Sequence, residues 1–290
     1  MNKNIEIIIV SGPTASGKTK KAVEICKERN GEIISCDSRQ VYRYLDVGSN
    51  KEGVLLKSGL REVDGVLQHL TDIINPDQNY SVANFVEDAD LKITEILKKG
   101  RIPVIVGGTG LYIKSLLYGL DKMPKTNINL RGELKSKPHI ELYDRLLKLD
   151  PESAKKNKKN PQRLLRALEV NILSRKTLQE HFKIKSPRYK FSHFSIFIEK
   201  KNLYNKINER CKYMIENGMI EETQKVLDIG FNENCFALSG IGYKYVVRYL
   251  SGKISRESLI SEFSKDTRRY AKRQVTWFKA QSGIEFINGK

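Results

Sequence analysis

The chain has 290 residues, of which 39% are hydrophobic, and a formal net charge of +18 at pH 7. This length suits one large domain or a core with a smaller unit, and the hydrophobic fraction excludes a disordered chain. No apolar run approaches the ~18 residues of a membrane span, and the four cysteines form neither a CxxC pair nor a zinc-binding spacing. We therefore expect a reduced, cytoplasmic protein with no structural metal and no membrane partner.

The first predicted element is a buried strand, Ile5–Val10, in which Glu6 argues against a signal peptide. Residues 12–19 then read Gly-Pro-Thr-Ala-Ser-Gly-Lys-Thr, and a helical pattern follows them. A strand, a glycine-rich loop and a helix in this order are the context of a phosphate-binding loop. Its backbone N–H groups and the helix N-terminus would cradle phosphate oxygens. Lys18 would add a positive charge, and the Thr19 hydroxyl would reach Mg²⁺.

Two further strands end in polar residues. The first, Glu32–Cys36, ends at Asp37. A predicted helix, Val82–Lys98, comes next. The second strand, Ile102–Val106, ends in Gly-Gly-Thr-Gly at 107–110. Apolar strands separated by helices predict an α/β fold, a parallel sheet with helices on both faces, as in phosphate-loop NTPases. Ligands of such sheets bind at the carboxyl ends of the strands. The phosphate loop, Asp37 and the threonine of the last run should therefore share one crevice.

After Tyr118 the chain becomes basic and loses its strand patterns. Residues 122–188 hold 18 lysines and arginines against seven acidic residues. Asn160 and Pro161 predict a helix start, as N-cap and first helical residue. On that helix Leu164, Leu168 and Ile172 share one face, and Lys159, Arg163 and Arg166 another. We predict an all-helical insertion at 122–188 with an exposed basic face, within a catalytic core of 1–121 and 189–290.

The last third should complete the core. We predict a strand at Phe191–Ile198, one long helix at Tyr204–Leu227 and a final helix around Thr267–Phe278. The final helix has an apolar stripe and a basic remainder: Phe263, Tyr270 and Trp277, against Arg268, Arg269, Lys272 and Arg273. With the insertion, it carries most of the positive charge. Charge concentrated in this way favours a polyanion, and nucleic acid before a membrane.

The residues leave the phosphate chemistry open. Phosphoryl-transferring enzymes usually hold Mg²⁺ with an acidic residue at a later strand end, but the strand ending at residue 106 has none. Asp37 could help to hold Mg²⁺, as in a small-molecule kinase, or could act as a general base. A kinase would not explain the basic insertion.

Six motifs in order, spanning residues 5 to about 280, resemble the tRNA dimethylallyltransferases, also called tRNA isopentenyltransferases. They are Gly-Pro-Thr-Ala-Ser-Gly-Lys-Thr at 12–19, Asp-Ser-Arg-Gln-Val-Tyr at 37–42, Gly-Gly-Thr-Gly-Leu-Tyr at 107–112, Pro-Gln-Arg-Leu-Leu-Arg-Ala-Leu-Glu at 161–169, Ile-Gly-Tyr-Lys at 241–244 and Arg-Tyr-Ala-Lys-Arg-Gln-Val-Thr-Trp-Phe at 269–278. With no zinc-finger extension after residue 280, the resemblance is to bacterial members.

The resemblance implies transfer of a dimethylallyl group from its diphosphate to N6 of the adenosine 3′ of the anticodon, with Mg²⁺. Asp37 would accept the N6 proton, and Thr109 would bond near the flipped base. The diphosphate site would comprise Gly12, Thr14, Ala15, Ser16, Gly17, Lys18, Thr19 and Arg210. The tRNA site would comprise Asp37, Ser38, Arg39, Gln40, Thr109, Arg131, Gln162, Arg163, Leu164, Leu165, Arg166, Ser239, Gly240, Ile241, Gly242, Tyr243, Lys244, Lys272, Arg273, Gln274, Thr276, Trp277 and Lys279.

Three alternatives stay open at this point. An adenylate isopentenyltransferase would act on free nucleotides and need no basic insertion. A small-molecule kinase would consume a nucleoside triphosphate, for which the loop could have affinity. A non-catalytic RNA-binding protein would not need Lys18, Thr19 and Asp37. Leu164 and Leu165 also fit a helix core, Tyr245 departs from the family's usual acidic or amide residue, and we expect a monomer.

Overall fold

The computed structural model describes residues 6–182 and 186–289, so Ile5 of the first predicted strand lies outside the described residues. The chain divides into two compact units, Met1–Tyr118 with Pro187–Lys290, and Gly119–Ser186. The predicted division at 122 and 188 differs from this one by two or three residues at each end.

The first unit is built on one eight-stranded sheet with the order β3-β4-β5-β2-β6-β1-β7-β8. Six strands run parallel to one another: β1 (Glu6–Ser11), β2 (Gly31–Ser35), β5 (Val66–His69), β6 (Ile102–Gly107), β7 (Lys190–Phe197) and β8 (Glu285–Asn288). In the middle of the sheet Ser11 lies opposite Gly107 on one side and Ser195 on the other. The phosphate loop therefore leaves the sheet between two parallel neighbours.

The prediction of a purely parallel sheet was incomplete. β3 (Val54–Leu55) and β4 (Arg61–Val63) form antiparallel pairs at one edge, and β4 turns into β5 through Asp64 and Gly65. Both turn residues have positive φ, 49° and 82°. An Asp-Gly pair of this kind is the usual signal of a tight hairpin, but the flanking strands are too short to show an alternating pattern.

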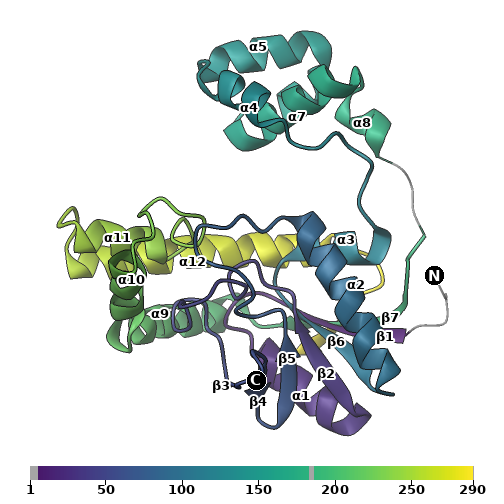
Figure 1. Cartoon of the computed structure of the whole chain (residues 1–290), viewed down its shortest axis with the longest axis vertical. Helices are drawn as coiled ribbons and strands as arrows, with labels where there is room; N and C mark the ends of the chain where they lie inside the picture. The colour runs from purple at the N-terminus through teal and green to yellow at the C-terminus, as the bar shows by residue number, and fades with distance from the viewer. Residues whose placement is uncertain (1–5, 183–185, 290) are drawn as a thin grey trace. The chain divides into compact units, whose positions relative to one another are not determined.

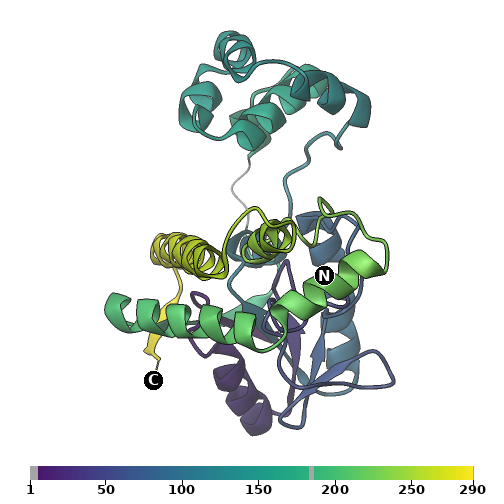
Figure 2. The same ribbon diagram turned by 90° about the vertical axis from the view of Figure 1, so that its left-hand side faces the viewer.

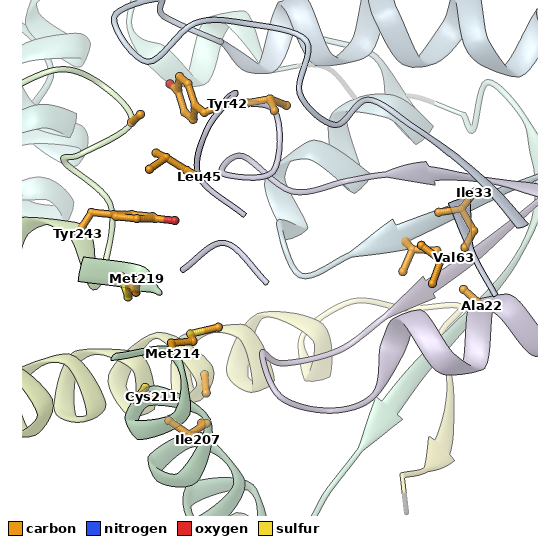
Figure 3. Close-up of a cluster of buried hydrophobic side chains, with 14 of the residues drawn as sticks. Ala22, Ile33, Tyr42, Leu45, Val63, Ile207, Cys211, Met214, Met219 and Tyr243 are labelled. Carbon is orange, nitrogen blue, oxygen red and sulfur yellow. The ribbon is translucent and has the colours of Figure 1, made fainter. Parts of the chain in front are cut away.

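Helices cover both faces of the sheet (Figure 1). Alternate residues of a strand point to opposite faces, so each face packs in a core of its own. Ile8 and Val10 of β1 pack in one core with α1 (Lys18–Arg29) and α9 (Lys200–Glu216). Ile7 and Ile9 pack in the other with α2 (Val82–Lys98) and α3 (Gly110–Tyr118). Figure 3 shows part of the first core, where Ala22 and Ile33 lie near Val63 and where Met214 and Met219 approach Tyr243. The predicted helices on both faces are confirmed.

The single helix predicted over Tyr204–Leu227 was wrong. Two helices lie there, α9 and α10 (Met219–Asp228), and the chain changes direction between them at Gly218 (Figure 2). Gly218 has φ +115°, a conformation that a residue with a side chain rarely adopts. A lone glycine in an amphipathic pattern does not reveal from sequence whether it ends the helix.

The final helix is longer than predicted. α12 runs from Arg256 to Lys279, and the Ser255 hydroxyl accepts from the Ser258 N–H as its N-cap. α12 packs against α9 and also contacts α11 (Tyr243–Leu250). Of the predicted stripe, Phe263 is buried, whereas Tyr270 and Trp277 are only partly buried. Phe263 is therefore a core residue, whereas Tyr270 and Trp277 each keep part of their surface exposed.

The carboxylate of Glu222 fixes the backbone of residues 46–48, in the loop that follows β2. Glu222 of α10 accepts from the backbone N–H groups of Asp46, Val47 and Gly48 at 2.6, 2.8 and 2.7 Å, and from the Tyr243 hydroxyl at 2.7 Å. Burial raises the pKa of Glu222, which these four donors oppose. The loop that leads away from Asp37 is thus held in one shape.

The second unit is all helical and has a core of its own. Its helices are α4 (Ile128–Lys135), α5 (His139–Leu149), α6 (Pro151–Asn157), α7 (Pro161–Ser174) and α8 (Leu178–His181). The Asn160 side chain accepts from the Arg163 N–H at 3.1 Å and Pro161 is the first helical residue, as predicted. Leu164 and Leu168 are fully buried in that core, and Ile172 packs against it. Among the described residues, no helix in either unit could cross a membrane.

Candidate active site

The phosphate loop is held by three residues with positive φ, Gly12 (147°), Ala15 (63°) and Gly17 (79°). A Cβ on Gly12 would lie 3.1 Å from the Ile196 carbonyl, so that position has no room for a side chain. The Lys18 ammonium reaches back over the loop and donates to the Pro13 carbonyl at 2.7 Å. The loop is therefore preformed, with its lysine folded across it.

Two cations face this loop. Lys18 and Arg210 of α9 both line the pocket above it, and the Arg210 guanidinium donates to the Thr14 hydroxyl. Neither has an ion pair with any described acidic residue, and the buried Arg210 Nε has no hydrogen-bond partner among them. Burial, with the Arg210 charge, lowers the pKa of Lys18 to about 8, and burial also lowers the pKa of Arg210. Partly buried cations that have no acidic partner among the described residues indicate a site for an anion.

Asp37 lies at the carboxyl end of β2 and lines the same pocket. Its Oδ1 accepts from the backbone N–H groups of Arg39 and Gln40, at 2.7 and 3.4 Å. This turn fixes the direction of the carboxylate while leaving Oδ2 available to a ligand. A carboxylate that shares one pocket with these two cations is the arrangement that the family resemblance implied.

The Gly-Gly-Thr-Gly run brings a second loop to the pocket. A Cβ on Gly107 would lie 2.0 Å from the Cys36 carbonyl, one on Gly108 2.1 Å from Gln274 Nε2, and one on Gly110 2.4 Å from the Trp277 ring. Each glycine therefore lets a different neighbour approach closely. Thr109 itself does not line the pocket but bonds to Tyr270, which does.

The inner side of α12 forms one wall of the pocket. Gln274 is 5% exposed; its Oε1 accepts from the Thr14 N–H at 2.9 Å and its Nε2 donates to the Gly108 carbonyl at 2.9 Å. One turn earlier, Tyr270 lines the pocket, and burial raises its pKa to about 12. The sequence placed Tyr270 in a core stripe and Gln274 among RNA contacts. A polar pair four residues apart on the buried side of a basic helix is the signal that was missed.

The outer side of α12 differs in character. Its exposed residues include Lys272, Arg273, Thr276 and Lys279, which are among the predicted RNA contacts. Trp277 is partly buried against the second glycine loop. The helix therefore presents cations outward and site-forming side chains inward.

The other predicted RNA contacts in this unit are more varied. Ser38 is partly exposed, and Gln40 lines the pocket while its Nε2 donates to the Asn50 carbonyl at 2.9 Å. Arg39 donates to the Phe236 carbonyl at 2.8 Å and thereby holds the segment 235–241, which contains Ser239, Gly240 and Ile241. In the next turn, Gly242 has φ +96° and Tyr243 is 2% exposed. Lys244 is exposed at its tip.

Tyr245 stands where the family usually has an acidic or amide residue, and it contacts Lys244. The Tyr245 hydroxyl and the Lys244 ammonium both donate to Asp266 Oδ2, at 2.5 and 2.8 Å, and the ammonium lies 4.6 Å from the Tyr245 ring centroid. These hydrogen bonds lower the pKa of Asp266 to about 2. Lys244 is thus held on the surface by a carboxylate from α12.

In the helical unit the predicted contacts divide by burial. Gln162 and Arg163 are exposed, whereas Leu164 and Leu165 are in the core. Arg131 and Arg166 lie 3.7 and 2.7 Å from the fully buried Glu169 carboxylate, and each keeps about 30% of its side chain exposed. Glu169 also accepts from the Asn127 N–H at 2.9 Å. One buried acid therefore fixes two of the predicted arginines.

Several pocket residues had no signal in the sequence. Ser49, Asn50, Glu52 and Gln68 line the pocket, and they come from the loop before β3 and from β5. They reach the site only because the β3–β5 edge and the loop held by Glu222 fold over it. The negative charge of Glu52 favours the protonated forms of Lys18 and Arg210. It therefore opposes the lowering of their pKa values by burial.

Comparison with known proteins agrees with this geometry. A family model described as IPP transferase matches residues 40–281, and one described as isopentenyl transferase matches residues 5–63. A tRNA dimethylallyltransferase of Endomicrobium trichonymphae is 73% identical over 98% of this chain and 95% of its own length. The chain belongs to the tRNA dimethylallyltransferase family. Members of this family are prenyl-transferring enzymes, so the prediction of a prenyltransferase is confirmed.

Solved structures of the tRNA dimethylallyltransferase family share the fold. The tRNA isopentenylpyrophosphate transferase of Bacillus halodurans is 35% identical, with a TM-score of 0.72 over 99% of this chain and 90% of its own. A eukaryotic dimethylallyltransferase that acts on tRNA aligns with a TM-score of 0.81 over 98% of this chain and 74% of its own, at 23% identity. At that identity the likeness concerns the fold alone.

Proposed function

We propose that this chain transfers a dimethylallyl group from dimethylallyl diphosphate to N6 of the adenosine 3′ of the anticodon in tRNA, with release of diphosphate. The observation that carries the proposal is the pair of cations, Lys18 and Arg210, that face the phosphate loop without an acidic partner among the described residues. Asp37 lines the same pocket. Family membership supplies the substrate class, because the similar proteins are named for tRNA and for dimethylallyl transfer.

In the reaction the carbon–oxygen bond of the prenyl diphosphate breaks and its electron pair leaves with the diphosphate. Lys18, Arg210 and the loop N–H groups face the oxygens where that charge develops, and preorganised charge of this kind stabilises a leaving group without reorganisation. The adenine N6 forms the new bond to carbon. Its proton passes to Asp37 Oδ2, which later releases it to solvent.

The pocket fits a hydrated divalent cation. The Thr19 hydroxyl offers an oxygen donor of the kind that Mg²⁺ prefers, Thr19 is the second residue of the helix behind the loop, and the Glu52 carboxylate lines the same pocket. Mg²⁺ bound there would neutralise charge on the diphosphate. Thr19 would hold it through its hydroxyl, beside oxygens of the diphosphate, which leaves Asp37 to accept the proton.

The basic surfaces would hold the RNA. The exposed cations of α12, Lys244 and the arginines fixed by Glu169 suit phosphate contacts, which supply affinity, while a recessed pocket requires the target base to leave its stack. An anticodon stem-loop offers unpaired bases that can be extruded at low cost. We propose that the protein acts in the cytoplasm as a monomer.

The test is transfer of radiolabelled dimethylallyl from its diphosphate, with Mg²⁺, into an unmodified anticodon stem-loop bearing the target adenosine, beside an equal concentration of AMP. We expect label in the stem-loop and none in AMP. Label in AMP would instead indicate an adenylate isopentenyltransferase. Label in neither would contradict the proposal, and consumption of ATP in a parallel reaction supplied with ATP and Mg²⁺ would favour a kinase.

A further inference from the structure

Gln274 has contacts that an RNA-binding residue does not need. It lies on α12 between exposed cations, yet its side chain points inward and is almost fully buried. Both ends of its amide are used: Oε1 accepts from the Thr14 N–H and Nε2 donates to the Gly108 carbonyl, each at 2.9 Å. A buried amide that satisfies two backbone groups 94 residues apart in sequence joins the two loops of the site.

The contact with Thr14 reaches the diphosphate site. Because the Thr14 N–H is bonded to Gln274, the orientation of the Thr14 peptide is restrained, and with it the backbone position from which the Thr14 side chain extends. That hydroxyl accepts from the Arg210 guanidinium. Arg210 has no carboxylate partner among the described residues, so Thr14 is a principal restraint on where its charge lies. The chain of contacts runs from Gln274 through Thr14 to Arg210.

The contact with Gly108 sets the other side of the pocket. A Cβ on Gly108 would lie 2.1 Å from Gln274 Nε2, so a side chain at residue 108 would displace the Gln274 amide from its present position. Thr109, the next residue, is bonded to Tyr270, one turn before Gln274 on α12. The loop is thus fixed to the inner side of α12 at two successive residues.

We propose that Gln274 is a positioning residue for the diphosphate site: it holds the phosphate loop against the Gly107–Gly110 loop and, through Thr14, holds Arg210 over the leaving group. It would then make no contact with RNA. This inference rests on the proposed function for the identity of the anion, but its test uses diphosphate alone.

The principal variant is Gln274→Met, which keeps the volume and removes both hydrogen bonds. Isothermal calorimetry with inorganic diphosphate and Mg²⁺ should show binding weakened on the order of tenfold or more, since a displaced Arg210 no longer meets the phosphate. The KM for dimethylallyl diphosphate should rise, while the Kd for the anticodon stem-loop and its salt dependence stay within about twofold. Gln281→Met is the matched control: its amide donates only to the Trp277 carbonyl at 3.1 Å, and it should change neither value.

The two Michaelis constants separate positioning from a loss of stability. In Gln274→Met the KM for dimethylallyl diphosphate should rise while the KM for the stem-loop stays near its wild-type value, because only the diphosphate site loses its two restraints. A variant that is merely less stable, but folded by circular dichroism at the assay temperature, would keep the wild-type KM for both substrates.

The outcomes divide clearly. Diphosphate binding unchanged in Gln274→Met, or RNA binding weakened as much as diphosphate binding, would overturn the inference. If the Met variant does not fold, Gln274→Asn replaces it: the amide stays neutral, but on its shorter arm it cannot reach both the Thr14 N–H and the Gly108 carbonyl, and it should weaken diphosphate binding without affecting RNA. If wild-type protein binds diphosphate but transfers no prenyl group, the proposed function fails while Gln274 is still tested.

Discussion

At the scale of single residues, the proposed reaction assigns the binding of an anion and the acceptance of a proton to different side chains. Lys18 and Arg210 face the phosphate loop, and Asp37 lines the same pocket from the end of β2, which β6 separates from β1. The Asp37 carboxylate is oriented by two backbone N–H groups that bond to Oδ1 alone. Oδ1 therefore shapes the turn, and the proposed proton acceptor is Oδ2, so the two roles can be tested separately.

Asp37→Asn should remove the base and keep the turn, because the amide oxygen can still accept from the Arg39 N–H. We expect turnover to fall at least ~10²-fold, while the Kd for the stem-loop changes by no more than a few-fold. Single-turnover transfer and filter binding measure the two quantities. Asp77→Asn, on an exposed residue, is the control. Turnover close to that of the wild type would exclude Asp37 as the base.

The pKa of Lys18, about 8, predicts how prenyl diphosphate binding depends on pH. A bound diphosphate stabilises the ammonium, so the pKa of Lys18 is higher in the complex than in the free enzyme. Affinity should therefore be constant below pH 8 and fall by up to about tenfold per unit above it. Calorimetry between pH 6.5 and 9.5 measures this dependence. In Lys18→Met, binding should be weak and the decline above pH 8 absent; a decline that persists would assign it to another group.

At the scale of elements, α12 carries two functions on opposite sides. Tyr270 and Gln274 form a wall of the pocket, while Lys272 and Arg273 point outward. Of the predicted apolar stripe, Tyr270 therefore lines a polar site, whereas Phe263 is in the first core and Trp277 packs against the second. The start of α12 was also missed, because residues 256–266 show no strong apolar period.

Replacing Lys272 and Arg273 with Ala should weaken stem-loop binding and reduce its salt dependence. Each phosphate contact in single-stranded RNA contributes ~0.7 to the log–log slope, so we expect a loss of up to ~1.4. Diphosphate binding should not change. The matched control is Lys27→Ala with Arg29→Ala, an exposed pair in the last turn of α1, which lies at the end of that helix away from the phosphate loop. Equal effects from the two pairs would mean that only net charge matters.

At the scale of the whole molecule, the two compact units have separate cores. The core of the helical unit consists of residues of α4 to α7, with Leu130 and Leu178 at its edge. The buried Glu169 ties Arg131 and Arg166 to that core. The unit can therefore lose its packing without loss of the diphosphate site.

Leu168→Ala tests this division. Leu168 is fully buried, and truncation of such a leucine costs about 2–5 kcal/mol, all of it in the helical unit. We expect weaker stem-loop binding and an earlier unfolding transition for that unit, with diphosphate affinity unchanged. Denaturant unfolding followed beside calorimetry measures both. Leu173→Ala, on a residue 39% exposed, should have little effect. A fall in diphosphate affinity would show that the units are energetically coupled.

The sequence by itself determined what depends on local pattern. The phosphate loop, Asp37 at a strand end, the Asn160–Pro161 helix start and the helical character of the insertion were all read from neighbouring residues, because the physics of turns and caps acts over a few positions. Six motifs in order were also enough to indicate the family. Arg210 was the exception: only the resemblance singled it out, as nothing near it in sequence is distinctive.

Tertiary structure decided everything that required distant segments to meet. It placed Glu52 and Gln68 in the pocket, ended a helix at Gly218, and turned Gln274 inward to join Thr14 to Gly108. Sequence spacing gives the face on which a side chain lies, but not which element packs against that face. Whether a polar residue of α12 meets solvent, RNA or a phosphate loop therefore depends on contacts formed only when the chain folds.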